Sequence, residues 1–210
     1  MIVSPPLYVL EFYQENFQVI DGVVSYKNED TGVRIGSRRA PVGQELGRSE
    51  NRGAKNYWVI TVSGVKRKRS HIVWFLETGK WPSKESIDHI NGDSHDDRFE
   101  NLRECTLLEN SQNMGKISGG EFNGIVRYRT KAEGWFAKVT CEGNSYYGLG
   151  ENPNDHRTCE KIIRETKEEA ARDYDWLKLK VLPMHGIDPT FSSLNFPGEP
   201  LRHPTQGLQS

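Results

Sequence analysis

Residues 87–115 constrain the fold of this chain more than any other part of its sequence. A strand-like segment ends at Asp88-His89, and the Asn91-Gly92 pair after it is typical of a tight turn between antiparallel strands. Residues 101–103 fit a returning strand, and residues 107–114 fit a short helix. Because a hairpin with a helix behind it brings residues distant in sequence to one point, the sequence predicts a small α+β module that could hold a site.

Four polar residues of this module suit the hydrolysis of a phosphodiester bond. Asp88 and Asn110 could supply oxygen ligands to a hard divalent cation such as Mg²⁺. His89, on the other face of the strand, could take a proton from water as a general base, and Asn101 could accept the second imidazole N–H. Each residue alone also has an ordinary structural explanation, such as a turn, a cap or a polar surface. Their combination in this order favours the catalytic interpretation.

The three cysteines argue against a zinc site or a disulfide framework. Cys105, Cys141 and Cys159 are far apart, and no Cys-x-x-Cys pair exists. We therefore expect reduced cysteines, no zinc, and a catalytic metal, Mg²⁺ or Mn²⁺, held by oxygen and nitrogen ligands. The N-terminus lacks the features of a signal peptide, and no apolar run is long enough to span a bilayer. The expectation is an intracellular protein with no membrane partner.

The distribution of charge along the chain permits a nucleic-acid partner, although the total does not suggest one. The formal net charge is −1, whereas DNA-binding proteins are usually basic. Residues 27–70, however, carry 11 Lys and Arg against 4 Asp and Glu, and residues 71–120 carry 5 against 9. The basic segment could attract phosphate while the acidic one holds a cation. An ordinary patchwork of solvated charges explains the same distribution equally well.

Upstream of residue 87 the sequence predicts hairpins and short helices. Asp21-Gly22 and Ser63-Gly64 are hairpin-turn signals between apolar, β-branched segments. Gly79 follows a dense apolar segment and would end a helix. The expected elements are a helix over residues 7–16, strands over 17–20 and 23–26, a basic surface loop over 34–52, strands over 57–62 and 65–69, and a helix over 71–77.

Downstream, the flexible stretch 116–120 is the main candidate for a domain boundary. Three strands and one long helix are expected after it, and Pro183 would end the helix. The expected elements are strands over residues 125–129, 135–140 and 145–149 and a helix over 158–181. The expected parts of the chain are a hairpin and basic-loop region (1–52), the module with the site (53–117), a sheet with a helix (118–198) and a disordered tail (199–210).

Residues 65–113 resemble the His-Asn-His homing endonucleases of bacteriophages, which are members of the ββα-metal nuclease group. The motifs that carry the resemblance are HIVWFLETGKWP, DHINGD, DDRFENLR and ENSQN. The resemblance implies a nuclease with a single divalent metal ion. It also implies Asp88 and Asn110 as metal ligands, His89 as the general base, and Asn101 as the residue that holds this histidine.

The same resemblance gives lesser roles to neighbouring residues. Asn113 is a weaker candidate for support of the site, and Asp93, Asp97 and Arg98 are expected to be turn and strand-pairing residues. His95 is expected to be an exposed turn residue. The residues expected to contact DNA beside the cut are Arg67, Arg69 and His71.

Residues 123–150 and 168–197 resemble the DNA-binding domain of plant ethylene-response factors, which also occurs fused to phage His-Asn-His nucleases. The matching pieces are NGI, GWFA, LG, EEAARDYD and LNF. The resemblance implies a three-stranded antiparallel sheet that enters the major groove, with one helix packed behind it. Arginine can read guanine edges, and aromatic rings can lie against sugars or methyl groups. The residues implied on or near the binding face are Arg127, Arg129, Trp135, Lys138 and Tyr147.

Together these features predict an α+β chain in which β-hairpins precede a ββα-metal nuclease module and a three-stranded antiparallel sheet packed on a helix follows it. The predicted function is a phage homing endonuclease, monomeric by default, that cuts double-stranded DNA in the cytoplasm of a host bacterium. Two other functions stay open: a restriction or defence nuclease, and a catalytically silent, sequence-specific DNA-binding or regulatory protein. The presence of all four site residues argues against a silent protein, because decay would be expected to remove at least one.

Overall fold

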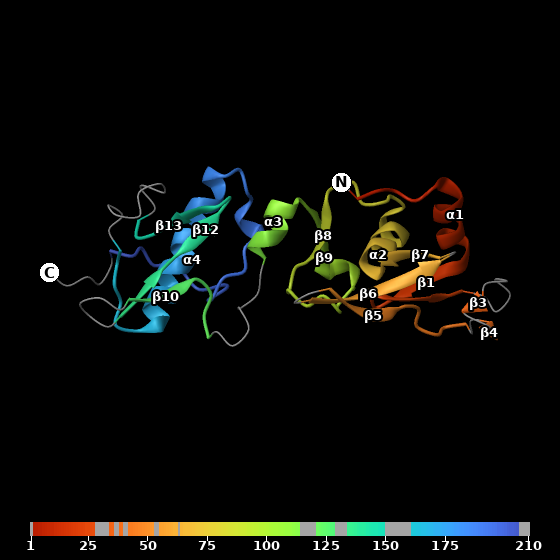
Figure 1. Ribbon diagram of the computed structural model, residues 1–210, viewed down its shortest axis with the longest axis horizontal. Helices are drawn as coiled ribbons and strands as arrows, with labels where there is room; N and C mark the ends of the chain where they lie inside the picture. Colours follow the sequence, from red (N-terminus) through yellow and green to blue (C-terminus); the bar gives the residue numbers. More distant parts are fainter. Residues whose placement is uncertain are drawn as a thin grey trace. The chain divides into compact units, whose positions relative to one another are not determined.

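The computed structural model describes residues 2–27, 34–35, 38–39, 42–52, 55–62, 64–113, 121–128, 134–149 and 161–205. The chain forms two compact units, Met1–Asn110 and Ser111–Ser210. Figure 1 shows that each unit combines short strands with helices, so the predicted α+β class is confirmed. None of the described helices is long and apolar enough to cross a membrane. The expected linker at residues 116–120 lies outside the described residues.

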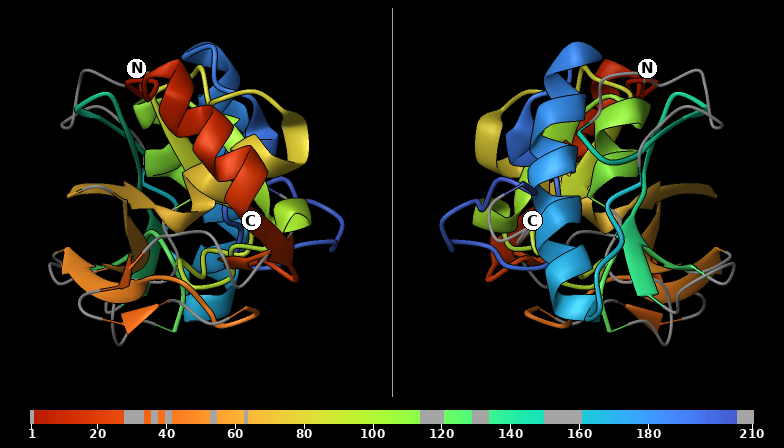
Figure 2. Two further views of the ribbon diagram at one scale, coloured as in Figure 1. Left: turned by 90° about the vertical axis from the view of Figure 1, so that its right-hand side faces the viewer. Right: turned by 90° about the vertical axis from the view of Figure 1, so that its left-hand side faces the viewer.

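The first unit begins with a helix that leads directly into a hairpin. Helix α1 (Leu7–Asn16) is followed without a loop by strand β1 (Phe17–Ile20), which pairs antiparallel with β2 (Val23–Tyr26) (Figures 1 and 2). Asp21 and Gly22 have φ angles of 50° and 77°, the positive values that a two-residue hairpin turn requires. The predicted helix, both strands and the turn are confirmed.

A three-stranded antiparallel sheet forms the middle of the first unit. Its strands pair in the order β5 (Arg48–Arg52), β6 (Lys55–Val62) and β7 (Val65–Lys68). The hairpin β6–β7 matches the prediction, but residues 34–52 are not simply a surface loop. Strand β5 has no apolar alternation in its sequence, so its main-chain pairing with β6 decides its structure. The same stretch also contains a short pair of strands, β3 (Arg34–Ile35) and β4 (Arg38–Arg39).

The core of the first unit joins its N-terminal elements to helix α2 (Arg69–Thr78). Tyr13 of α1 stacks on Phe17 with 5.3 Å between ring centroids, and both rings belong to the same buried cluster as Ile72 of α2. Helix α2 ends where predicted, at Gly79, whose left-handed backbone (φ 71°) is favoured by glycine. Buried residues that precede residue 52 in the sequence, among them Phe17 and Leu46, belong to this core, and the domain boundary expected at residue 52 stays a prediction.

The last elements of the first unit are a second hairpin and the beginning of a helix. Strand β8 (Ser86–His89) pairs antiparallel with β9 (Leu102–Cys105), and helix α3 (Leu107–Gln112) follows. Thr106 and Glu109 cap the first turn of α3 reciprocally. The Glu109 N–H donates to Thr106 Oγ1 at 3.1 Å, and the Thr106 N–H donates to Glu109 Oε2 at 2.7 Å. The turn after β8 and the returning strand lie where the sequence predicts them.

The second unit packs helix α4 (Lys167–Met184) against short strands, as Figure 1 shows. The predicted three-stranded sheet is replaced by two two-stranded sheets, because the middle strand is interrupted at Lys138. The Lys138 N–H donates to the carbonyl oxygen of Gly124 at 2.8 Å instead of continuing a strand. The pairs are β10 (Ile125–Tyr128) with β11 (Gly134–Ala137), and β12 (Val139–Cys141) with β13 (Asn144–Tyr146).

Helix α4 begins later than the sequence predicts, because Thr166 caps it. The Glu169 N–H donates to Thr166 Oγ1 at 3.2 Å, and the Thr166 hydroxyl lies 3.1 Å from the Glu169 carboxylate. The expected start at residue 158 lies outside the described residues, and residues 161–166 are not helical. Pro183 falls in the last turn, so the helix ends close to the predicted position.

Residues 199–205 pack on the second unit, although the sequence predicts disorder from residue 199. Pro204 is fully buried, and its carbonyl oxygen accepts a hydrogen bond from Arg164. The Nε of Arg164 also donates to the buried Asp173 carboxylate at 2.7 Å. This polar anchor is not visible in the sequence, because it joins three separate segments. Residues 206–210 lie outside the described residues.

Candidate active site

Asp88 lies on strand β8 directly opposite Arg103 of β9. Its side chain is 2% exposed. The Nε and Nη2 groups of Arg103 donate to Asp88 Oδ2 at 2.9 and 2.8 Å. A buried carboxylate is stable only with a compensating positive group. In this hairpin the guanidinium of Arg103 supplies the positive charge. The carboxylate that it neutralises, Asp88, is the one that the sequence predicts as a metal ligand.

Asn110 reaches the same face of β8 from helix α3. Its Nδ2 donates to Ser86 Oγ at 3.1 Å. Ser86 and Asp88 are two residues apart on one strand, so their side chains share a face and are separated by roughly 7 Å along the strand. The two predicted metal ligands, Asp88 and Asn110, therefore belong to one face of the hairpin.

The donor groups on this face fit a hard divalent cation. Asp88 and Asn110 offer one carboxylate and one amide oxygen, which suits Mg²⁺ or Mn²⁺ with water and phosphate oxygens in the remaining positions. In the part of the chain that the structure describes, no three His, Cys, Asp or Glu side chains gather as a metal site. Cys105 and Cys141 are buried free thiols, as expected. A cation here would depend on water and substrate for most of its ligands, and it would compete with Arg103 for Asp88.

His89 points to the other face of β8 and pairs with Asp97. The imidazole Nε2 lies 2.8 Å from Asp97 Oδ1, and the side chains are 6% and 2% exposed. The ring of Tyr57 lies beside the imidazole, with 6.5 Å between centroids. The sequence predicts that Asn101 holds the histidine and that Asp97 is a turn residue. In the structure the carboxylate of Asp97 makes the contact with the ring.

Asp97 is itself held by Arg69, which is the first residue of helix α2. The Nε of Arg69 donates to Asp97 Oδ2 at 2.7 Å, and its Nη1 pairs with Glu45. The guanidinium also lies over the ring of Trp58, 4.5 Å from its centroid. Arg69 is 3% exposed. The charge of Arg69 is thus used inside the protein to hold Asp97, and its contact with DNA stays a prediction.

Asn101 closes the loop that joins β8 to β9. It ends a single 3-10 turn, Phe99–Asn101, at the base of this loop. Its Oδ1 accepts the Asn91 N–H at 2.9 Å, and its Nδ2 donates to Asn91 Oδ1 at 3.0 Å and to the Asp96 carbonyl at 2.8 Å. These bonds join the two ends of the loop, so Asn101 fixes the backbone that follows His89. The hydrogen bonds of its side chain go to this loop and not to the imidazole.

Arg67 and His71, two other expected DNA contacts, border a cavity beside α2. Arg67 is partly buried, and its Nη1 donates to the Lys66 carbonyl at 3.1 Å. His71 packs edge-on against Trp81 with 5.9 Å between ring centroids. Burial, with the nearby charges of Lys68 and Arg67, lowers the pKa of His71 to about 3. His71 is therefore neutral at physiological pH and cannot attract a phosphate by charge.

In the second unit, two of the expected DNA contacts share a face. Arg127 on β10 is exposed and lies opposite Trp135 on β11, so their side chains are cross-strand neighbours. The ammonium group of Lys167 lies over the Trp135 ring, 5.3 Å from its centroid. Lys138 sits at the break between β11 and β12, and Arg129 lies outside the described residues. The structure brings Arg127 and Trp135 together without assigning them a ligand.

Sequence reasoning missed two residues of the site, Asp97 and Arg103. The signal for Arg103 was present, because a hairpin that pairs residue 89 with 102 must pair Asp88 with Arg103. No comparable signal marks Asp97, whose contact with His89 depends on the path of the loop between them. The loop brings the carboxylate back to the imidazole across eight residues of sequence.

Comparisons with known proteins agree with this location of the site. Residues 67–112 match the family model described as HNH endonuclease, so the match includes all four predicted site residues. The chain is also 36% identical over 84 residues to Protein 3.8 of Escherichia phage T7, an alignment that covers 39% of this chain and 69% of that protein. No solved structure matches the chain. The family match ends at residue 112, so the ethylene-response-factor-like character of the second unit stays a prediction.

Proposed function

The chain belongs to the HNH endonuclease family, and we propose that it is a metal-dependent endonuclease that hydrolyses phosphodiester bonds in double-stranded DNA. The observation that carries this proposal is the placement of Asp88 and His89 on opposite faces of β8. Asp88 shares its face with Asn110, and His89 is oriented by Asp97 on the other. In this proposal β8, β9 and α3 form the ββα-metal module.

Asp88 and Asn110 would hold the metal ion, Mg²⁺ or Mn²⁺. When bound, a divalent ion at this position neutralises the charge that develops on the scissile phosphate and on the departing oxygen. Asp88 contributes the anionic ligand, and Asn110 is held at the same face by its bond to Ser86. Arg103, which pairs with Asp88, would lie near enough to the metal ligand to donate hydrogen bonds to a phosphate oxygen there.

His89 would act as the general base that takes a proton from the attacking water. An ionised carboxylate only accepts hydrogen bonds, so Asp97 favours the tautomer with the proton on Nε2. The basic lone pair of the neutral ring is then on Nδ1, which is the nitrogen that would receive the proton. Asn101 contributes by fixing the loop that follows His89, and not by touching the ring.

We further propose a phage homing role in the cytoplasm of the host bacterium, with the second unit as an additional DNA-binding module. The similarity to a phage protein supports the phage setting. The cross-strand pair of Arg127 and Trp135 supports a DNA-binding face on the second unit, to which Arg129 and Lys138 would contribute. Two binding modules on one chain raise the effective concentration of each, so each alone can be weak.

The direct test is the cleavage of supercoiled plasmid DNA. Wild-type protein with Mg²⁺ or Mn²⁺ should convert the plasmid to nicked or linear forms, and EDTA should prevent this. His89→Ala should abolish cleavage while DNA binding, measured by fluorescence anisotropy, stays within about threefold, because the base acts only in the chemical step. His95→Ala is the matched control, since His95 is an exposed histidine in the following loop.

The alternatives give different results in the same experiment. Tight DNA binding without cleavage in any divalent metal would indicate a silent DNA-binding protein. Equal cleavage by wild type and His89→Ala would refute the assignment of the base. Circular dichroism of each variant shows whether the loss is chemical or structural, because His89 is buried.

A further inference from the structure

Two consecutive residues fasten helix α3 to the beginning of strand β8. The carboxylate of Glu85 accepts the N–H of Leu107, the first residue of α3, at 3.0 Å. The next residue, Ser86, is bonded to the side chain of Asn110 one turn further along the helix. These bonds hold the first turn of α3 against the strand and place Asn110 beside Ser86.

The hydroxyl group of Ser86 can only accept in its bond with Asn110. Ser86 is the first residue of β8 and is 8% exposed. Its Oγ donates to the carbonyl oxygen of Ile87 at 3.4 Å. A hydroxyl has a single proton to donate, so the 3.1 Å bond to Asn110 uses its oxygen as the acceptor. Nδ2 of Asn110 is therefore the donor in this pair.

This bond decides which end of the Asn110 amide is available to a ligand. An amide has one acceptor oxygen and one donor nitrogen, and only the oxygen can bind a hard cation. With Nδ2 on Ser86, Oδ1 accepts no hydrogen bond from the residues that the structure describes. An amide turned by half a rotation would present its N–H groups at the same place, and these would repel a cation.

We propose that Ser86 is a positioning residue of the metal site, and that its hydroxyl holds the Asn110 amide in the orientation that presents Oδ1 to a divalent cation. The inference rests on the proposed function, in which Asp88 and Asn110 are the metal ligands. A site with two protein ligands depends strongly on each of them. Groups that orient a metal ligand typically contribute about 10–100-fold to metal affinity.

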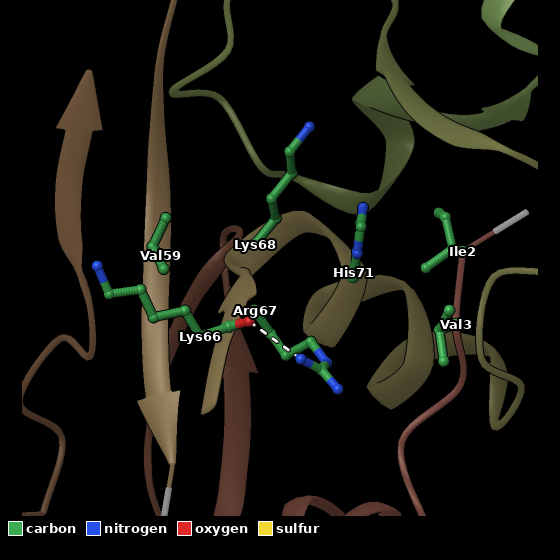
Figure 3. Close-up of a pocket in the computed structure, with 7 residues that line it drawn as sticks. All are labelled: Ile2, Val3, Val59, Lys66, Arg67, Lys68 and His71. Atoms are coloured by element: carbon green, nitrogen blue, oxygen red, sulfur yellow. Dashed lines mark hydrogen bonds between the residues drawn. The ribbon is translucent and has the colours of Figure 1, made fainter. Parts of the chain in front are cut away.

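The cavity beside helix α2 is not a competing site for this cation. Figure 3 shows that its lining includes His71, whose neutral imidazole is a group that can bind metal ions. The same lining contains Lys66, Arg67 and Lys68, and no acidic side chain among the described residues. Positive charges repel a divalent cation. A cation bound by the first unit is therefore expected at Asp88.

The test measures Mn²⁺ binding to the full chain without DNA, so that its outcome is independent of cleavage. Bound Mn²⁺ is measured from the decrease in the electron paramagnetic resonance signal of the free ion. Ser86→Ala should weaken Mn²⁺ binding about tenfold, whereas Ser86→Thr, which keeps the hydroxyl, should stay within about twofold of wild type. Asp88→Asn should remove the binding, which locates the measured ion at this site.

Ser25→Ala is the matched control. Ser25 is also a buried serine, 4% exposed, and its Oγ accepts an amide N–H from Gln18 Nε2 at 3.2 Å in the N-terminal hairpin. Its replacement should change the Mn²⁺ affinity by less than about twofold, because this bond orients no metal ligand. Equal losses in Ser25→Ala and Ser86→Ala would indicate a general loosening of the fold and overturn the proposal.

A second substitution separates the orientation of the amide from packing. In Asn110→Asp the carboxylate presents an oxygen whichever way it turns, so it needs no partner to orient it. Adding Ser86→Ala to Asn110→Asp should therefore change the Mn²⁺ affinity by less than about twofold. The same loss, about tenfold, with Asn or Asp at position 110 would show that Ser86 does not act through the amide.

The side-chain amide of Asn110 gives a direct signal in ¹⁵N NMR spectra, which also show whether each variant is folded. The Nδ2 resonance should shift on addition of Mg²⁺ in wild type and Ser86→Thr, and in Ser86→Ala only at about tenfold higher Mg²⁺. Wild-type metal affinity in folded Ser86→Ala would overturn the proposal, even in a chain that cleaves DNA. Metal binding that depends on Ser86 in a chain that cleaves no DNA would instead contradict the proposed function alone.

Discussion

The carboxylate of Asp97 lies 2.8 Å from Nε2 of His89, and both side chains are almost completely buried. Arg69 holds the other carboxylate oxygen at 2.7 Å. Arg69, Asp97 and His89 therefore form a row of buried side chains, in which Asp97 contacts the other two. A carboxylate in this position fixes both the orientation and the tautomer of a histidine.

Replacing Asp97 by Asn should therefore reduce cleavage while leaving DNA binding unchanged. Asn has nearly the same shape, but it carries no charge and its amide can present a donor to the ring. Loss of such an orienting partner typically costs about 10–100-fold in activity. The measurement is the cleavage rate at saturating DNA, together with the ¹⁵N chemical shifts of the His89 ring, which report its tautomer.

Asp93→Asn is the control for this substitution. Asp93 is exposed in the same loop, and its Oδ1 accepts the His95 N–H at 2.9 Å, which an amide oxygen can also do. Cleavage by this variant should match wild type. Equal rates in both variants would mean that Asp97 has no part in positioning His89.

Gly22 of the N-terminal hairpin lies against the backbone of Asp97 and Arg98. Its φ is +77°, and a Cβ placed there would lie 2.4 Å from the Arg98 backbone nitrogen and 2.5 Å from the Asp97 carbonyl carbon. Gly22→Ala should destabilise the chain and also displace Asp97. Gly64 is the matched position, because its φ is +79° and nothing lies within 4 Å of an added Cβ.

The two alanine variants separate backbone strain from the clash. Gly64→Ala should cost about 1–2 kcal/mol of unfolding free energy and leave cleavage unaffected. Gly22→Ala should cost more than this and should also slow cleavage. Urea unfolding and the plasmid assay measure the two quantities. If Gly22→Ala cleaves DNA like Gly64→Ala, the hairpin does not support the site.

The elements that could be predicted from sequence are those with local signals. The hairpin around Asp21-Gly22 needs positive φ at both turn residues, and Asp-Gly satisfies this requirement whatever surrounds it. Strand β5 has no such signal, because its polar sequence is held by main-chain bonds to β6. Helix α4 also has a local signal: Thr166 precedes its first turn, Thr166 Oγ1 accepts the Glu169 N–H, and threonine is a favoured N-cap residue.

The candidate site also has parts that local sequence motifs predict and parts that depend on the tertiary structure. The motif around Asp88 and His89 predicts which residues gather, because a hairpin with a helix has few possible geometries. It does not predict that Arg69 is buried, since arginine is usually exposed and only the tertiary structure supplies its partners Asp97 and Glu45. Nor does the motif predict that the imidazole of His89 contacts the carboxylate of Asp97.

Removing the guanidinium of Arg103 should make the chain bind divalent metal more tightly. Arg103 supplies the positive charge on the buried Asp88 carboxylate. Arg103→Gln leaves that carboxylate poorly compensated, which lowers stability in EDTA and makes a cation more favourable at the same position. The rise in melting temperature on saturation with Mn²⁺ should be larger for this variant than for wild type.

Arg98→Gln is the control for the metal experiment, because Arg98 pairs with Asp96 on the exposed side of the loop. Its metal-induced rise in melting temperature should equal that of wild type. The same rise in Arg103→Gln as in wild type would argue that Asp88 does not bind the metal. This result would also remove one of the two ligands from the proposed mechanism.

His71 should make the first unit less stable as the pH falls. Burial, followed by the charges of Lys68 and Arg67, lowers its pKa in the folded chain from 6.5 to about 3. Between these values the unfolded chain binds a proton that the folded chain does not, so the free energy of unfolding decreases as the pH falls from 6.5 toward 3. The loss of unfolding free energy between pH 7.5 and pH 5 that is due to His71 should be about 2 kcal/mol.

His71→Gln removes the titrating group. The unfolding free energy of this variant, measured in urea, should therefore decrease by about 2 kcal/mol less than that of wild type between pH 7.5 and pH 5. His95→Gln, which removes an exposed imidazole, is the control. Parallel pH profiles for wild type and His71→Gln would show that His71 is not held neutral in the folded chain.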